Sequence, residues 1–280
     1  MNSKFSYSPH EWALILGASS GFGGATALEL SRHGMNVIGV HFDRAAGVPA
    51  VEQLIKEIEG NKVKARFFNI NASDPEKRNE ALDTIKSEFA SDAKNTIRVL
   101  MHSLAFGSLK PLVSPKVDQC LTQAQIEMTM DVMANSIVYW TQGVIARGLM
   151  KEGGRIFAMT SSGGHSVLLN YGSVSAAKAA LESYIRQMAL ELGHMGITAN
   201  AILGGVTDTP ALRKIPGAVK MLEVAKARNP SLHNCRPEDI AKAIALLSHD
   251  NSYFISGNVI RVDGGEDVVQ FIGQKSVIEP

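Results

Sequence analysis

Short apolar runs alternate with longer amphipathic segments along almost the whole chain. Buried strands are predicted where the apolar runs stand, at 12–16, 37–40, 65–68, 99–102, 155–159, 198–202 and 259–262. Between them, apolar residues recur at helical spacing over 22–33, 47–60, 76–89, 122–149, 171–192 and 237–248. Strand, helix and strand repeated with right-handed crossovers predict an α/β fold with a doubly wound, Rossmann-type parallel sheet of about seven strands.

No low-complexity segment or Pro/Ser-rich linker divides this pattern, and 280 residues suit one large domain. We therefore predict a single Rossmann-type domain over 12–270, with an N-terminal extension (1–11) before it and a C-terminal tail (271–280) after it. The least regular stretch, about 207–234, is long for a loop inside a compact domain. It is predicted to form a lid over the substrate crevice.

Composition narrows the classes of function. The formal net charge is +1, so neither nucleic acid nor an anionic membrane surface is an expected partner. The chain has no uninterrupted apolar stretch of about 18 residues, and no membrane span is expected. Cys120 and Cys235 are too few for a disulfide framework, which favours a cytoplasmic protein. The eight histidines lack metal-ligand spacing, so we expect no metal site.

The first predicted strand runs into a glycine-rich turn, where ligands of such sheets bind at the carboxyl ends of the strands. The candidate cofactor-binding residues in this turn are Gly17, Ser19, Ser20, Gly21, Phe22 and Gly23. Glycines let the backbone turn sharply and approach a diphosphate, whose charge the free amides of the following helix stabilise. A glycine triplet also occurs in ordinary tight turns, so this motif alone is a weak signal.

The end of the second strand indicates which dinucleotide is bound. An NAD-specific protein usually places an acidic residue there to hold the ribose 2′-hydroxyl. His41 takes that position and Arg44 follows just beyond it. A 2′-phosphate would meet a cation at Arg44, so NADPH is favoured over NADH. Alternatively, Arg44 is a solvated loop residue and Asp43 contacts the ribose.

Tyr171 and Lys178 stand seven residues apart in a predicted helix. Seven residues advance about two turns, so the phenol and the ammonium would share a face with their backbones about 10 Å apart along the axis. The two groups could then flank one cofactor. Without further context, a Tyr and a Lys on one helix usually serve only packing and solvation.

That context is a family resemblance. The spacing of Gly17, Gly21 and Gly23 resembles that of the short-chain dehydrogenase/reductase family, and the likeness extends over about 12–268. Ordinary members space the catalytic Tyr and Lys by four, whereas Tyr171 and Lys178 resemble the Tyr-x6-Lys pair of the enoyl-acyl-carrier-protein reductases.

Two further segments are similar to those reductases. His102-Ser103-Leu104-Ala105-Phe106 resembles their His-Ser-Ile-Ala-Phe run and differs from the Asn-Asn-Ala-Gly run of ketoreductases. Gly204-Gly205 replaces the commoner Pro-Gly, as expected for the divergent NADPH-linked branch. At the usual position of the ketoreductase relay asparagine stands Met133, with Asn135 as a neighbour, so that relay would be interrupted.

The resemblance implies roles for individual residues. Tyr171 would hydrogen-bond the developing enolate oxygen, and Lys178 would hold the nicotinamide ribose. Ser161 stands where many enoyl reductases have a second Tyr, so Ser161 or Ser162 would be a second donor or merely shape a turn. The other implied cofactor contacts are Asn69, Ile70, Ser103, Leu104, Ala105, Gly205, Val206 and Thr209. The implied substrate contacts are Phe106, Tyr171 and Leu212.

The implied reaction is NADPH-dependent reduction of the C2–C3 double bond of trans-2-enoyl thioesters in fatty-acid biosynthesis, by a homotetramer. The source of the C2 proton stays open. One alternative is an NADPH-linked carbonyl reductase acting on a 3-ketoacyl thioester or another small ketone. Another is a cofactor-sensing or structural protein without turnover.

The predicted lid carries an unusual charge balance. Residues 212–228 include five cations and one acid, with apolar residues at helical intervals. One face could cover an acyl chain, and the other could receive an acidic acyl carrier protein, with attraction that weakens as salt rises. The alternative is the solvated face of an ordinary surface helix.

Overall fold

The computed structural model describes residues 6–269. Within them seven strands form one parallel sheet in the order β3-β2-β1-β4-β5-β6-β7. The strands are β1 (Glu11–Leu16), β2 (Asn36–His41), β3 (Ala65–Asn69), β4 (Thr96–His102), β5 (Arg155–Thr160), β6 (Thr198–Gly204) and β7 (Val259–Val262). The predicted single-domain, doubly wound α/β fold is confirmed, while the predicted tail (271–280) lies outside the described residues.

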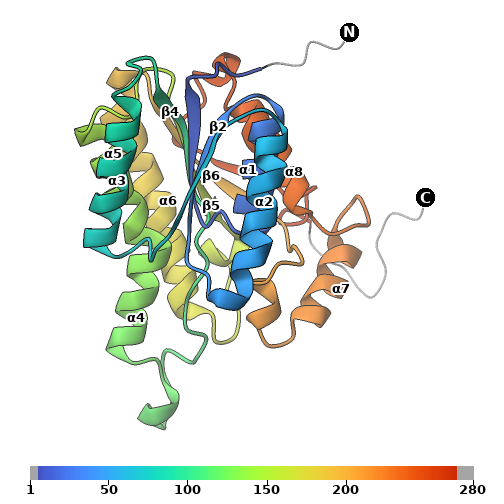
Figure 1. Cartoon of the computed structure of the whole chain (residues 1–280). Helices are drawn as coiled ribbons and strands as arrows, with labels where there is room; N and C mark the ends of the chain where they lie inside the picture. The colour runs from blue at the N-terminus through green and yellow to red at the C-terminus, as the bar shows by residue number, and fades with distance from the viewer. Residues whose placement is uncertain (1–5, 270–280) are drawn as a thin grey trace.

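Helices cover both faces of the sheet (Figure 1). On one face lie α1 (Gly21–Arg32), α2 (Val48–Gly60) and α8 (Pro237–Leu247). On the other face lie α3 (Pro75–Phe89), α4 (Gln123–Met130), α5 (Ser136–Ala146) and α6 (Gly172–Leu192). The predicted lid contains a short 3₁₀ turn (Leu212–Lys214) and α7 (Ala218–Arg228), which agrees with the helical spacing of its apolar residues.

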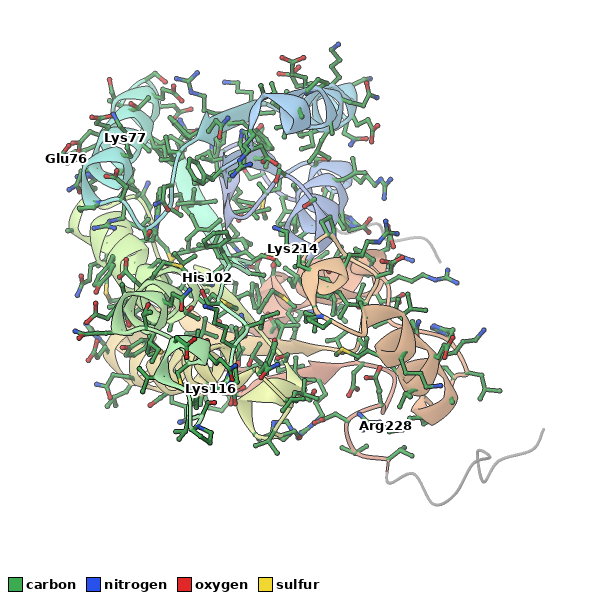
Figure 2. The ribbon with its side chains drawn as sticks, turned by 90° about the horizontal axis from the view of Figure 1, so that it is seen from below. Glu76, Lys77, His102, Lys116, Lys214 and Arg228 are labelled. Atoms are coloured by element: carbon green, nitrogen blue, oxygen red, sulfur yellow. The ribbon has the colours of Figure 1, made fainter. Side chains whose placement is uncertain are left out.

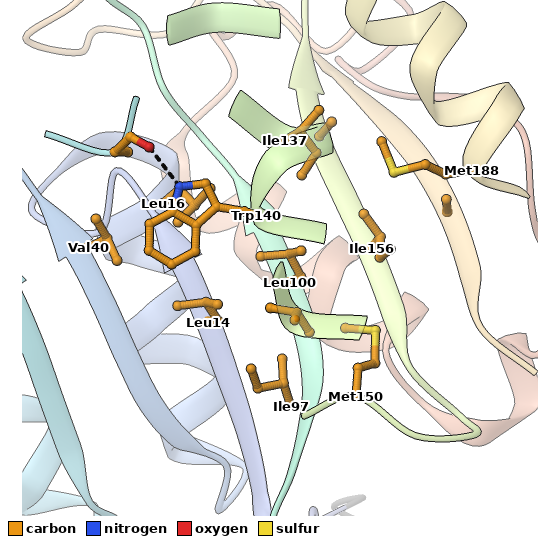
Figure 3. Close-up of a cluster of buried hydrophobic side chains, with 14 of the residues drawn as sticks. Leu14, Leu16, Val40, Ile97, Leu100, Ile137, Trp140, Met150, Ile156 and Met188 are labelled. Atoms are coloured by element: carbon orange, nitrogen blue, oxygen red, sulfur yellow. Dashed lines mark hydrogen bonds between the residues drawn. The ribbon is translucent and has the colours of Figure 1, made fainter. Parts of the chain in front are cut away.

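Two hydrophobic cores separate the sheet from its two helical layers. Successive side chains of β1 enter opposite cores, Leu14 and Leu16 on one face and Ala13 and Ile15 on the other. Trp140 of α5 is fully buried among residues of the first core, and its indole N–H donates to Ala72 O at 2.8 Å (Figure 3). Burying a side chain of this size contributes roughly 1.5–3 kcal/mol or more. The core thus holds α5 and α6 firmly beside the carboxyl ends of β4 and β5.

Two predicted helices differ from those observed. The predicted helix over 122–149 is divided, because a π-helical segment (Asp131–Asn135) separates α4 from α5. Ser136 Oγ bonds back to Val132 O at 2.9 Å, a contact that often accompanies such irregularities. The predicted helix over 171–192 begins one residue later, so Tyr171 is its N-cap residue, with φ −100° and ψ 3°. Short π segments are frequent at functional sites.

Candidate active site

The carboxyl ends of all seven strands lie at one edge of the sheet. Because every strand is parallel, the carboxyl ends of β1 to β7 face the same way, and the strand order reverses beside β1. Ligands of doubly wound sheets bind at this switch point. Figure 2 views the molecule from this side, with His102 at the end of β4, Lys116 in the connection to α4, and Lys214 and Arg228 in the lid.

The turn after β1 accepts only glycine at two positions. Gly17 has φ +88°, and a Cβ there would overlap the carbonyl of Ser103. A Cβ on Gly23 would overlap the carbonyl of Gly17. Ser103 N in turn donates to Leu16 O at 2.8 Å, and Leu104 lies over the turn. The ends of β1 and β4 are therefore packed backbone against backbone at the switch point.

The start of α1 presents unsatisfied donors. Its N-cap residue, Ser20, makes no side-chain cap, and the first turn has no acidic residue. The first amides of the helix thus lack an intrahelical acceptor and carry positive partial charge. Thr209 Cγ2 lies 3.6 Å from the Cβ position of Gly21, so the chain after β6 reaches this turn. This arrangement fits the diphosphate of a dinucleotide.

The ends of β2 and β3 are joined through Asp43. Asn69 accepts from Asp43 N at 3.0 Å and donates to Asp43 O at 2.9 Å. His41 is buried, with Nδ1 2.9 Å from Asp43 Oδ2. Arg44 is exposed and has no ion-pair partner within residues 6–269. One oxygen of the Asp43 carboxylate, Oδ2, is therefore engaged by His41, whereas the guanidinium of Arg44 has no ion pair among the described residues. Ile70 continues this edge, its N–H donating to His41 O at 2.8 Å.

Tyr171 lies beside Ser161 at the head of α6. A Cβ added to Gly163 would stand 2.5 Å from the Tyr171 ring and 3.3 Å from Ser161 Oγ. Ser161 Oγ is buried without a hydrogen-bond partner among the described residues. Burial raises the pKa of the Tyr171 phenol, and the nearby Ser161 hydroxyl opposes that shift only in part. The phenol therefore stays protonated at neutral pH and can donate a hydrogen bond.

Lys178 is buried in α6 and points back to β5. Its Nζ donates to Met159 O at 2.7 Å. Burial lowers the pKa of this ammonium to about 8, against the opposing influence of Glu182 one turn further on. Glu182 itself accepts from Thr160 Oγ1 at 2.6 Å. An ammonium has three donors, so Lys178 retains two for a ligand.

The π-helical segment carries the residues around the expected relay position. Met133 is buried, and Asn135 Oδ1 accepts from Tyr184 OH at 3.0 Å. His102, fully buried, has Nε2 2.9 Å from Ser136 Oγ. Burial and the charge of Lys178 lower the pKa of His102 to about 3, so its imidazole is neutral. The His102–Ser136 contact was not predicted, although His102 belongs to a run that the resemblance singles out.

The loop after β6 is supported by a carboxylate that sequence reasoning missed. Val206 N donates to Glu266 Oε2 at 3.2 Å, and a Cβ on Gly205 would stand 2.8 Å from that oxygen. Glu266 is only 3% exposed. Its one sequence signal is that it directly follows Asp263-Gly264-Gly265. Because Val206 N–H is taken by Glu266, a cofactor would meet the side chain or carbonyl of Val206.

Exposed apolar side chains gather near Tyr171. Phe106 is 60% exposed, and the adjacent Gly107 packs against Val174 of α6. Leu112 contacts Gly172. Leu212 is half-buried in the lid, and Leu212 N donates to Thr209 Oγ1 at 3.1 Å. Further exposed apolar residues lie in the connection between β4 and α4 and in the connection between β5 and α6: Val113, Val117, Val167, Leu168 and Leu169.

Other kinds of site receive no support from residues 6–269. In that part of the chain, no three His, Cys, Asp or Glu side chains gather as metal ligands would. None of the helices there has both the length and the apolar character needed to cross a bilayer. Cys120 and Cys235 are free thiols.

Comparison with known proteins gives a consistent family. A family model described as "Enoyl-(Acyl carrier protein) reductase" matches residues 17–266. The chain is 28% identical over 254 residues to the 3-oxoacyl-[acyl-carrier-protein] reductase FabG of Pseudomonas aeruginosa, covering 90% of this chain and 96% of that protein. It is 27% identical over 218 residues to the enoyl-[acyl-carrier-protein] reductase [NADH] FabI of Nostoc sp., covering 78% and 81% respectively.

Solved structures agree on the fold. A dehydrogenase/reductase from Sinorhizobium meliloti has a TM-score of 0.79 at 25% identity, covering 93% of this chain and 96% of that one. The FabI–NADH complex from Alistipes finegoldii has a TM-score of 0.80 at 19% identity, covering 95% and 91%. The similar proteins include a ketoacyl and an enoyl reductase at nearly equal identity. The chain is an oxidoreductase that belongs to the short-chain dehydrogenase/reductase superfamily.

Proposed function

We propose that this protein reduces the C2–C3 double bond of trans-2-enoyl thioesters with NADPH, in fatty-acid biosynthesis. The observation that carries the proposal is the head of α6, where the protonated phenol of Tyr171 and the buried amine of Lys178 stand seven residues apart with donors to spare. The expected relay is also interrupted, because Met133 is apolar and Asn135 is engaged by Tyr184. That interruption supports enoyl over carbonyl reduction.

Tyr171 would donate its O–H to the thioester oxygen, where negative charge accumulates. Bound NADPH would supply the hydride that C3 receives. A donor aimed at developing charge stabilises the transition state more than the ground state, which accelerates the reaction. Because burial raises its pKa, Tyr171 remains a donor across the neutral range.

Lys178 and the glycine turn would hold the cofactor. The amine of Lys178, fixed through Met159 O, would direct its remaining N–H groups to the nicotinamide ribose. With a pKa of about 8, it is largely charged at neutral pH. The start of α1 and Thr209 would receive the diphosphate, and Gly205 and Val206 would line the nicotinamide. Phe106 and Leu212 would flank the acyl chain.

Cofactor choice is expected to depend on Arg44. The Arg44→Gln variant should raise the Kd for NADPH about tenfold, because a charge-assisted bond to the 2′-phosphate is lost. Its Kd for NADH should stay within about twofold. Both constants can be measured by nicotinamide fluorescence. Arg66→Gln is a matched control, since Arg66 lies on β3 and pairs with Glu88. A wild-type preference for NADH would contradict the assignment.

The reaction itself is tested by paired substrates. NADPH oxidation should be at least about a hundredfold faster with an enoyl thioester than with the 3-ketoacyl thioester of equal length, since no relay serves a carbonyl oxygen. Spectrophotometric initial rates decide this. Faster oxidation with the keto substrate would instead establish the carbonyl reductase alternative. One observation favours that alternative: Ser161 Oγ is buried beside Tyr171 and has no hydrogen-bond partner within residues 6–269, as a second carbonyl donor would be.

The proposed setting is a cytoplasmic homotetramer that takes its substrate from an acyl carrier protein. The named relatives that act on acyl carrier protein substrates support this carrier. Within the described residues, however, Arg213 pairs with Asp208, Lys220 with Glu223 and Arg228 with Glu266. Lys214 and Lys226 are thus the lid cations available for carrier docking.

A further inference from the structure

The turn after β7 is held by hydrogen bonds between its own residues. Asp263 accepts from Gly265 N at 2.9 Å through one oxygen and from Asp267 N at 2.8 Å through the other. Gly264 and Gly265 have φ of +66° and +87°, in the left-handed region that glycine adopts without strain. Residues 263–267, the C-terminal turn, therefore form a fixed platform beside the end of β6.

Three loops around the crevice attach to this C-terminal turn. Val206 N donates to Glu266, as described above. Asn229, buried at the end of the lid helix α7, donates through Nδ2 to Asp263 O at 2.8 Å. His165, which follows Ser161, lies 3.1 Å from Asp267 through Nε2. The turn thus joins the loop after β6, the lid and the loop that precedes Tyr171.

Glu266 is a buried carboxylate of this junction, as is Asp263. A buried carboxylate is costly unless donors and a cation surround it. Val206 N supplies one donor, at 3.2–3.3 Å from the two oxygens. Arg228 supplies the cation, with its guanidinium 3.9 Å from Oε1. Charge-assisted pairs in direct contact are about 2.7–2.9 Å long, so this ion pair has room to shorten by about 1 Å.

Arg228 is incompletely satisfied in the same place. It is the last residue of α7, at the edge of the lid in Figure 2. Its Nε is buried without a hydrogen-bond partner among the described residues. A small inward movement of α7 would bring this guanidinium onto Glu266. Glu266 is already bonded to the loop assigned to the nicotinamide.

We propose that Glu266 is a positioning residue that couples the seating of the lid helix to the nicotinamide-facing loop. Through Val206 it holds the loop, and through Arg228 it holds the lid. Ordering one of them lowers the cost of ordering the other, so cofactor binding draws α7 inward. This inference rests on the proposed function, because it takes the loop at Gly205 and Val206 as the nicotinamide site.

Two measurements on the full chain test the coupling. The first is the Kd for NADPH, and the second is the rate of tryptic cleavage after Lys214, with and without saturating NADPH. Glu266→Ala should raise the Kd about tenfold or more and abolish the protection of the lid by NADPH. Glu266→Gln keeps an acceptor for Val206 but loses the charge, so it should fall between Glu266→Ala and the wild type. Glu223→Gln, an exposed change on the same helix, should match the wild type.

A double-variant cycle separates coupling from general structural damage. Arg228→Met should lose lid protection, and Arg228→Met combined with Glu266→Gln should be no worse than Arg228→Met alone, since both act through one contact. Wild-type NADPH affinity and lid protection in Arg228→Met and Glu266→Gln would overturn the inference. Failure of the wild type to bind NADPH would overturn both this inference and the proposed function. Binding with turnover only of a ketone would overturn the proposed reaction and leave the coupling standing.

Discussion

The Tyr171→Phe variant is expected to turn over an enoyl thioester about 10² to 10³ times more slowly than the unaltered protein. Removing one donor from an oxyanion site typically costs that much. The ring remains and keeps its packing beside Gly163, so the loss is that of a single O–H group. NADPH affinity should change less than about threefold, because Lys178 and the glycine turn are untouched. Steady-state rates and fluorescence titration measure the two effects separately.

A matched control lies on the same helix. Tyr184 donates its hydroxyl to Asn135 and points to the π-helical segment. Tyr184→Phe should therefore keep its turnover, while losing about 1 kcal/mol of stability with that hydrogen bond. If Tyr171→Phe turned over as fast as Tyr184→Phe, the phenol of Tyr171 would have no part in the chemistry.

The second large effect is expected at the glycine turn. In Gly23→Ala, the new methyl group would overlap the carbonyl of Gly17, and both atoms belong to backbone that the sheet and α1 hold in place. Overpacking of this kind costs about 1–3 kcal/mol, which lowers the melting temperature by roughly 2–10 °C. The turn must also open, so we expect the Kd for NADPH to rise about a hundredfold.

Gly24→Ala gives the comparison one residue away. The nearest atoms to a Cβ there lie at 3.4–3.6 Å, which is ordinary contact or only slightly closer. Alanine also has better helix propensity than glycine, by about 1 kcal/mol. Gly24→Ala should therefore bind NADPH normally and unfold at the same or a higher temperature. Equal melting temperatures and equal NADPH affinities for the two variants would contradict the proposed role of the glycine turn in binding the diphosphate.

The fold and the glycine turn could be predicted from the sequence, because both depend on residue types and spacings that are visible in it. Five of the seven strands, β1, β2, β4, β5 and β6, are almost wholly buried, and the mainly apolar runs that form them are visible without any contact information. The turn is equally readable, because only glycine fits at Gly17 and Gly23. In both cases the contacts that determine the structure are with residues nearby in the chain or with the end of an adjacent strand of the predicted sheet.

The features that were missed depend on distant partners or on small shifts of backbone. Glu266 acts on Val206, 60 residues away, and no periodicity relates the two positions. The π-helical segment (Asp131–Asn135) leaves the apolar spacing on either side helical, so a single helix fits the pattern equally well. The His102–Ser136 contact spans 34 residues and depends on that same irregular segment.

The position of Tyr171 just outside α6 has a consequence for divergence within this scaffold. Its backbone is set by the preceding loop, through Tyr171 N to Leu168 O at 3.2 Å, whereas Lys178 is anchored to a central strand through Met159. Insertions or substitutions in that loop would move the hydroxyl of Tyr171 and leave the amine of Lys178 in place. Under the proposed function, changes in that loop would therefore alter substrate recognition, while the proposed contact of Lys178 with the dinucleotide would be retained.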